Sequence, residues 1–258
     1  MLKIYLFIIS LCVFLAIFAP ILSPYNPNLV NLSQAKIAPN LEHLFGTDML
    51  GRDVLTRILY SLRISLWVGF CASFLSVIFA FLYAFLTRLF AYAFFARVLD
   101  MLLALPSLLI IMFFQSFLNG GILSMTLVIA LGHFAYIARV LDIEIGKYQK
   151  LEFYENALIL GSTRFKALFS EIAPACLNLL FVLFVFNIAH AIANEATLSF
   201  FGLGVNLGEA SLGNMLNEAS KGLFLGFWWM LLFPVGFILL LILPLLALGN
   251  DLQKRSKL

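Results

Sequence analysis

The chain has 258 residues, of which 63% are hydrophobic and only 11% are charged, and its formal net charge is +3. Soluble domains carry about 25% charged residues, so lipid must cover much of the apolar surface of this chain. The small net charge and the lack of basic tracts interleaved with aromatic residues argue against nucleic acid as a partner.

Six apolar runs are long enough to cross a bilayer, which takes roughly 17–25 helical residues each. They predict an all-α polytopic membrane protein with one domain over residues 1–258 and spans near 4–22, 64–86, 98–118, 122–140, 176–196 and 229–249. The first run is longer than the apolar part of a signal peptide, and no clean cleavage site follows it. A retained anchor is therefore favoured over a cleaved signal.

The distribution of Lys and Arg predicts the orientation of these spans. With a cytoplasmic N-terminus, eleven of the 16 Lys and Arg residues fall inside, and five fall outside: Lys36, Arg52, Arg57, Arg63 and Lys221. The positive-inside rule then favours both termini in the cytoplasm. In this orientation the connection 141–175 is cytoplasmic, whereas segments 23–62 and 197–228 are on the outer side.

The two outer segments differ in character. Segment 23–62 opens on turn-forming Pro and Asn residues, and its end looks helical because apolar residues recur at every fourth position, at Val54, Ile58 and Leu62. We expect a helix over Phe45–Arg63 that lies on the surface near the mouth of the protein. Segment 197–228 is rich in glycine, and its central piece, EASLGNMLNEASKG, predicts a short amphipathic helix.

The stretch YENALILGSTRFKALFSEIAP, residues 154–174, is far more polar than a simple connection between two spans requires. It predicts two short helices. The first ends at Gly161, a residue suited to the left-handed backbone of a helix end, and Ser162 or Thr163 caps the second. Pro174 suits the first turn of the next span, where a missing N–H group has no consequence.

Catalytic and cofactor motifs are missing from the sequence. It has no glycine-rich phosphate loop followed by Lys and Ser or Thr, no nucleophile elbow and no HExxH motif. Its three cysteines, Cys12, Cys71 and Cys176, lie far apart within apolar runs. We therefore expect neither an enzyme nor a metal site, and no ATP site in this chain.

The polar stretch resembles the EAA loop of importer permeases in the ATP-binding cassette (ABC) superfamily. The resemblance rests on Glu155 and Ala157, on Gly161 four residues later and on Pro174, with Asn156 where the family usually has Ala. It implies that residues Glu155, Asn156, Ala157, Gly161 and Pro174 belong to a coupling loop that docks on a separate ATPase subunit.

Four further stretches resemble the peptide/nickel permeases, and specifically the second permease of each pair. They are FGTDMLGRDVLTRILYSLRISL (45–66), DMLLALPSLL (100–109), NEATLSFFGLG (194–204) and SLGNML (211–216). The resemblance implies an inner-membrane assembly of two related permeases, two ATPases that bind ATP and Mg²⁺, and an extracytoplasmic solute-binding protein. Asp48, Arg52 and Arg57 are then candidates for the platform that receives the binding protein. The alternative is a structural collar in which Arg52, Asp53 and Arg57 pair internally.

The fifth span carries the candidate pathway residues. Asn187, His190 and Asn194 lie within an arc of about 60° on a helix, and polar groups at membrane depth face protein or water. They either line the pathway or form hydrogen bonds between packed helices. Glu195 beside them faces either the outer vestibule or a structural partner.

The substrate is less determined than the family. Di- or oligopeptides are favoured over nickel or a nickel chelate, because no cluster of Cys, His and carboxylate residues is evident. A secondary transporter driven by an ion gradient is the other class to consider. It is disfavoured because the middles of the spans carry almost no carboxylates.

Overall fold

The structure is a computed structural model, which describes every residue except 1, 91, 207, 223–224 and 257–258. Three residues of the predicted outer segment 197–228 lie outside the described residues: Leu207, Leu223 and Phe224. Lys257, which is counted among the cytoplasmic Lys and Arg residues, also lies outside them. The described part is helical, and its only β pairing is an isolated bridge between Thr47 and Asp53. Its elements are α1 (Leu2–Ile17), α2 (Ala19–Leu22), the 3₁₀ turn η1 (Leu32–Gln34), α3 (Val54–Leu89), α4 (Tyr92–Leu103), α5 (Ser107–Ser116), α6 (Ile122–Tyr148), α7 (Glu152–Ile159), α8 (Arg164–Ala167), the π-helical turn η2 (Leu168–Ile172), α9 (Ala173–Phe200), α10 (Leu212–Gly222) and α11 (Trp229–Ser256).

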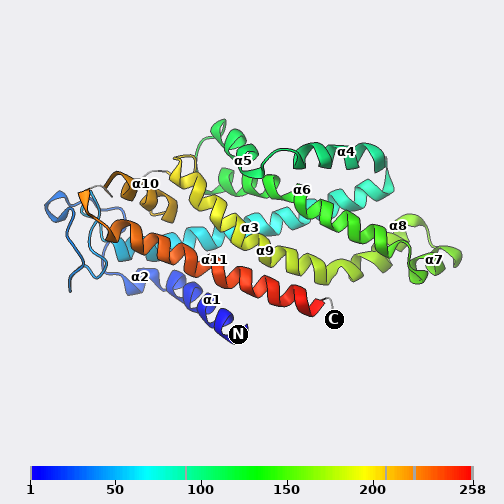
Figure 1. The fold of residues 1–258 in the computed structure, drawn as a ribbon, viewed down its shortest axis with the longest axis horizontal. Helices are drawn as coiled ribbons and strands as arrows, with labels where there is room; N and C mark the ends of the chain where they lie inside the picture. The colour runs from blue at the N-terminus through cyan, green and yellow to red at the C-terminus, as the bar shows by residue number, and fades with distance from the viewer. Residues whose placement is uncertain (1, 91, 207, 223–224, 257–258) are drawn as a thin grey trace.

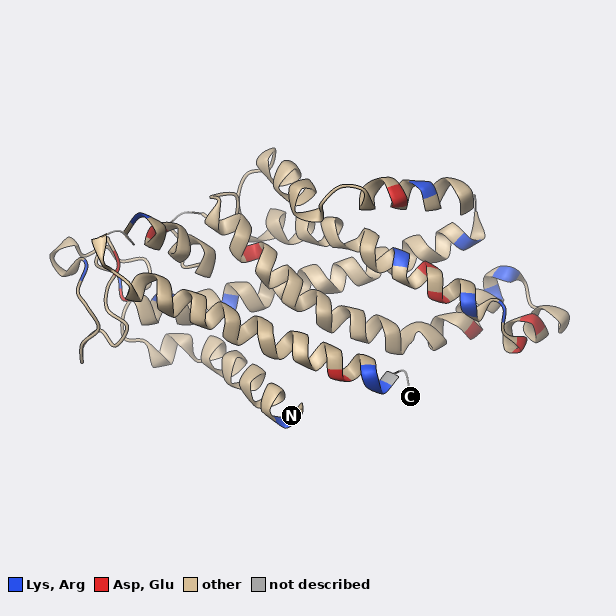
Figure 2. Ribbon diagram, in the orientation of Figure 1, with Lys and Arg blue, Asp and Glu red and all other residues tan. Residues whose placement is uncertain are grey.

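Among the described residues, four helical stretches are long and apolar enough to cross a membrane: α3, α6, the stretch from α8 through α9, and α11. They run along the long axis of the molecule (Figure 1). The charged residues gather toward the ends of these helices, and the middle of the bundle is almost free of them (Figure 2). This distribution is expected when the middle lies in hydrocarbon.

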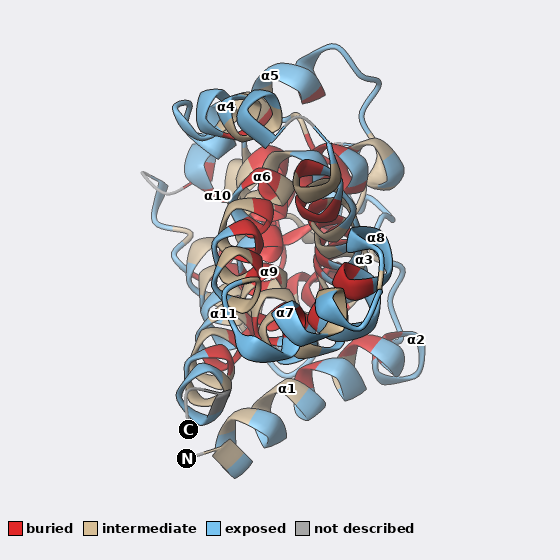
Figure 3. Cartoon of the chain, turned by 90° about the vertical axis from the view of Figure 1, so that its right-hand side faces the viewer, coloured by how far each residue is buried: buried red, intermediate tan, exposed pale blue. Residues whose placement is uncertain are grey.

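The core lies between α3, α6 and α9 (Figure 3). Half of the most apolar window of α6 is buried, compared with 22% of that of α11. α11 and the shorter α1 pack on the outside of the core through a cluster that includes Cys12, Ala16 and Leu241. Their remaining faces carry exposed Leu, Ile and Phe side chains, which is the surface expected toward lipid or another subunit.

The stretch predicted as the third span, 98–118, is a bent pair of helices in the structure. α4 and α5 are separate and meet at an angle of 85°. Pro106 lies between them and precedes the first residue of α5. Proline has no N–H group to donate and clashes with the preceding helical turn, so the helix ends before it.

The structure corrects the outer segment. The predicted surface helix over Phe45–Arg63 is wrong, because α3 starts at Val54 and continues without a break to Leu89. The predicted fourfold pattern does mark a helix, and Val54, Ile58 and Leu62 are all buried. Asp53 caps this helix by accepting a hydrogen bond from the N–H group of Thr56 at 2.7 Å. No proline interrupts the sequence after this cap, so the outer turns and the span form one helix of about 54 Å.

Candidate functional site

The loop between α6 and α9 has the predicted helix–turn–helix form. α7 ends at Ile159, and Gly161, two residues later, has a φ of +91°. The N–H group of Ser162 donates to the carbonyl of Ala157 at 3.0 Å, and that of Gly161 donates to Leu158 at 3.0 Å. This pair of bonds is the Schellman arrangement, in which a left-handed residue satisfies the last carbonyls of a helix.

Thr163 caps α8, since its side chain accepts from the N–H group of Lys166. The chain then passes through the π-helical turn 168–172 into α9, where Pro174 occupies the first turn as predicted. Helical structure is therefore continuous from Arg164 to Phe200.

α7 has one face on its own chain and another face open. Tyr154 is buried, and Ala157 and Leu158 pack against a cluster that includes Leu141 of α6 and Leu168 of η2. The small side chain of Ala157 thus serves packing within the chain.

The open face of the loop combines polar and apolar side chains. Glu155 and Asn156 are exposed, and Ile159 and Leu160 are 81% and 86% exposed. Phe165 of α8 is 60% exposed on the same loop. Apolar side chains this exposed at an end rich in charge are typical of a surface that another protein covers.

A charge network holds the neighbouring end of the bundle together. Arg88 of α3 donates to the carboxylate of Asp142 at 2.7 Å and to its carbonyl at 2.6 Å. Arg139 of α6 pairs with Asp100 of α4 at 3.0 Å. The helix ends around the loop are thereby tied to one another.

A polar cluster joins α6 and α9 in the apolar part of the bundle. His133 Nδ1 lies 2.6 Å from Asn187 Oδ1, and His133 Nε2 lies 2.6 Å from Asn194 Nδ2. The ring of His190 lies across that of His133, with centroids 6.5 Å apart. The structure therefore brings all three predicted pathway residues together, around a histidine that the sequence argument did not single out.

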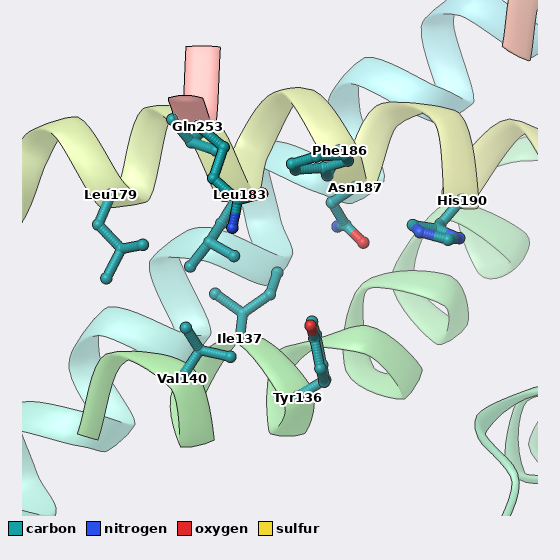
Figure 4. Close-up of a pocket in the computed structure, with 10 residues that line it drawn as sticks. Tyr136, Ile137, Val140, Leu179, Leu183, Phe186, Asn187, His190 and Gln253 are labelled. Carbon is teal, nitrogen blue, oxygen red and sulfur yellow. The ribbon is translucent and has the colours of Figure 1, made fainter. Parts of the chain in front are cut away.

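Two cavities adjoin this cluster, of about 310 and 350 Å³. Tyr136, Asn187 and His190 line both of them. Figure 4 shows these side chains converging from α6 and α9, and Gln253 of α11 also lines the first cavity. Phe186 also lines that cavity, so its side chain faces the same space as Asn187 and not the opposite face of α9.

Glu195 is a structural partner and not a vestibule residue. It is fully buried and accepts hydrogen bonds from Ser65 of α3 at 2.7 Å, Ser211 before α10 at 2.9 Å and Ser199 of α9 at 3.1 Å. A buried carboxylate needs such donors, because its desolvation is otherwise very costly. Glu195 thus ties three segments together at the outer end of α9.

Asp48, Arg52 and Arg57 form the structural collar and are not an exposed platform. All three are buried. Arg52 donates to Asp48 at 2.6 Å, and both arginines donate to Glu218 of α10, at 2.6 and 2.5 Å. The expectation that they offer charges to a binding protein does not fit this geometry, because the charges pair internally. The predicted collar is wrong in its carboxylate: Asp48 and Glu218 pair with the two arginines, whereas Asp53 Oδ1 lies 2.9 Å from His43 Nδ1.

His133 and Glu218 are the residues that the sequence argument missed. Each belongs to its network through a partner more than 50 positions away: Asn187 for His133, and Arg57 for Glu218. A single histidine or glutamate in such a sequence carries no local signal of that partner.

The fold resembles that of a solved transporter. The crystal structure of an amino acid ABC transporter with histidines aligns with a TM-score of 0.59 over 77% of this chain and 94% of that chain, at 16% sequence identity. At this identity the likeness establishes the fold alone.

The family is established from the sequence. Residues 72–257 match the family described as the binding-protein-dependent transport system inner membrane component, and the chain belongs to that family. It is accordingly a multi-pass inner-membrane permease component. A putative peptide permease protein of Brucella suis is 34% identical over 91% of this chain and 79% of its own length. The dipeptide transport system permease protein DppC of Bacillus subtilis is 29% identical over 96% of this chain and 78% of its own length.

Proposed function

We propose that the chain forms half of the translocation pathway of an ATP-driven ABC importer for di- and oligopeptides. The observation that carries the proposal is the family match over residues 72–257, together with relatives named as peptide and dipeptide permeases. The same relatives favour peptides over nickel. Membership of a binding-protein-dependent family also speaks against a secondary transporter driven by an ion gradient.

The partners in this proposal are a second homologous permease, two ABC ATPases that bind ATP and Mg²⁺, and an extracytoplasmic solute-binding protein. α1 and the bent pair α4–α5 complete six crossings, with both termini in the cytoplasm. The gathering of Lys and Arg at the end that carries α7 and α8 supports this orientation (Figure 2).

The ATPase docks on the open face of the coupling loop. Exposed Ile159, Leu160 and Phe165 supply apolar contact, and Glu155 and Asn156 supply polar contact. Tyr154 anchors the other side of α7 to the permease core, so a displacement of the loop moves the helices beneath it.

The substrate passes along the α6–α9 face. Cysteines at 187, 190 and 194 in a variant lacking Cys12, Cys71 and Cys176 should react with water-soluble thiol reagents. Cysteine at Ile192, which is fully buried on the other side of α9, is the matched control. Equal reactivity at 192 would contradict this assignment.

Uptake by the whole importer tests the proposed function. The chain should be purified with its permease partner, ATPases and binding protein, and reconstituted in proteoliposomes. We expect ATP-dependent uptake of a radiolabelled dipeptide that requires the binding protein. Uptake of nickel but not of any peptide would contradict the proposal.

A further inference from the structure

We propose that Asn187 presents its amide N–H groups to the transported peptide inside the cavities between α6 and α9, and that it binds a carboxylate or carbonyl oxygen there. This inference rests on the proposed function, because a peptide reaches the site only if the chain serves a peptide importer. It adds a binding position and the group of the substrate that this position recognises.

The hydrogen bonds of His133 determine how the amide of Asn187 is turned. The amide nitrogen of Asn194 can only donate, so His133 Nε2 accepts its hydrogen bond. In a neutral imidazole the other ring nitrogen then carries the proton, and Nδ1 donates to Asn187 Oδ1. The acceptor atom of Asn187 is thereby occupied, and its donor atom is directed away from His133.

The donor atom of Asn187 lacks a partner within the described chain. The side chain is buried, yet no described protein atom accepts a hydrogen bond from Nδ2. A buried donor left unsatisfied costs free energy, so the site gains from any acceptor that enters. Asn187 lines both adjoining cavities, and the entering group has room in either.

The surroundings of Asn187 favour a peptide oxygen over a peptide ammonium group. An ammonium group can only donate, so it cannot bind the Nδ2 donor of Asn187. The walls of the first cavity are apolar apart from Tyr136, Asn187, His190 and Gln253, and none of the described residues that line either cavity is Asp, Glu, Lys or Arg. A neutral donor binds an oxygen weakly enough to release it, as a transport pathway requires.

The test compares two variants of Asn187 in the reconstituted importer at saturating loaded binding protein. Asn187→Leu removes the donor with little change of size. Asn187→Asp still accepts from His133 but turns an oxygen toward the cavity. Gln115→Leu is the matched control, because Gln115 is a buried amide with an unpartnered Oε1 that lines neither cavity.

We expect dipeptide uptake to fall about tenfold in both Asn187 variants, while ATP hydrolysis stimulated by the loaded binding protein and uptake by the control stay unchanged. A loss confined to peptides with a free carboxylate identifies that group, and an equal loss for the carboxamide identifies a backbone carbonyl. Asn187→Asp carries the test if the leucine variant does not assemble.

Three results would overturn the inference: full uptake by both Asn187 variants, an equal loss in Gln115→Leu, or a loss only for peptides with a free amino group. The last result would mean that the amides of Asn187 and Asn194 and the proton of His133 are placed the other way round, so that Asn187 turns its oxygen toward the cavity. Failure of the unmodified importer to take up any peptide would instead overturn the proposed function.

Discussion

Replacement of Gly161 by valine tests whether the backbone at the end of α7 transmits the action of the ATPase. Gly161 has a φ of +91°, and a Cβ atom built on it meets no atom within 4 Å. Steric crowding therefore contributes nothing, and the effect of the substitution comes from the backbone alone.

The expected size follows from the cost of the left-handed conformation. A residue with a β-carbon loses about 1–2 kcal/mol there, which shifts the conformational equilibrium of the loop roughly 5- to 30-fold. Asparagine tolerates this region best, alanine less and valine least. Because Tyr154 and Leu158 remain packed on the core, the variants should insert normally while the loop end moves.

The assay is ATP-dependent peptide uptake together with recovery of the ATPases after solubilisation. We expect uptake close to normal for Gly161→Asn, reduced for Gly161→Ala and abolished for Gly161→Val, with ATPases lost or hydrolysing ATP without transport. Gly236→Val is the control, since Gly236 is also free of close neighbours but lies within α11 and has no left-handed backbone. Full uptake by Gly161→Val with its ATPases bound would refute the docking assignment.

Substitutions at three further positions probe the collar, the buried carboxylate and the α5–α6 contact. Glu218→Gln should destabilise the permease by about 1–3 kcal/mol. The loss is smaller than for a fully buried ion pair because the side chain of Glu218 is 22% exposed. A thermal unfolding midpoint equal to that of the unmodified protein would contradict this expectation. Glu195→Ala should prevent assembly of the importer, because it leaves three buried hydroxyl groups without their acceptor, whereas Glu195→Gln should allow partial assembly. Equal yields of the two complexes on size-exclusion chromatography would show that the bonds from these hydroxyl groups are dispensable. Gly132→Val should displace Ile111 of α5, because an added Cβ lies 2.2 Å from its side chain, and it should lower the melting temperature more than Gly236→Val does; equal melting temperatures would contradict this packing.

Local rules made the coupling loop predictable from the sequence. The left-handed turn at Gly161 after α7 and the cap at Thr163 depend on residues within a few positions of one another. Predictions of helix bounds were wrong where they rested only on the apolar character of a run. Residues 98–118 are mostly apolar, yet Pro106 divides them into two helices. Residues 54–63 form one helix with the span that follows, because nothing between them stops a helix.

Contacts between residues far apart in the chain could not be predicted from the sequence. The collar could be listed as an alternative, but the choice between it and an exposed platform depended on Glu218, which lies more than 160 positions from Arg57. The pathway residues could be placed on one face of a helix, but His133 comes from another helix, and only the packing of α6 on α9 brings it to Asn187.

The coupling loop, the neutral cavity and the outer end of the bundle are joined by one helical rod. The stretch from Arg164 to Phe200 has 37 residues, or about 55 Å, and starts directly after the turn that follows α7. It passes Asn187 beside the cavity and reaches Glu195, which is bonded to α3 and to the start of α10. We expect a displacement of the loop to reach the cavity through continuous helix, because the hydrogen bonds of buried Glu195 hold the outer end. No ion pair joins the described residues that line the cavities, so we expect α9 to move against α6 there by changing neutral hydrogen bonds. These bonds are weaker than the ion pairs Arg57–Glu218 and Arg88–Asp142 at the two ends of the bundle.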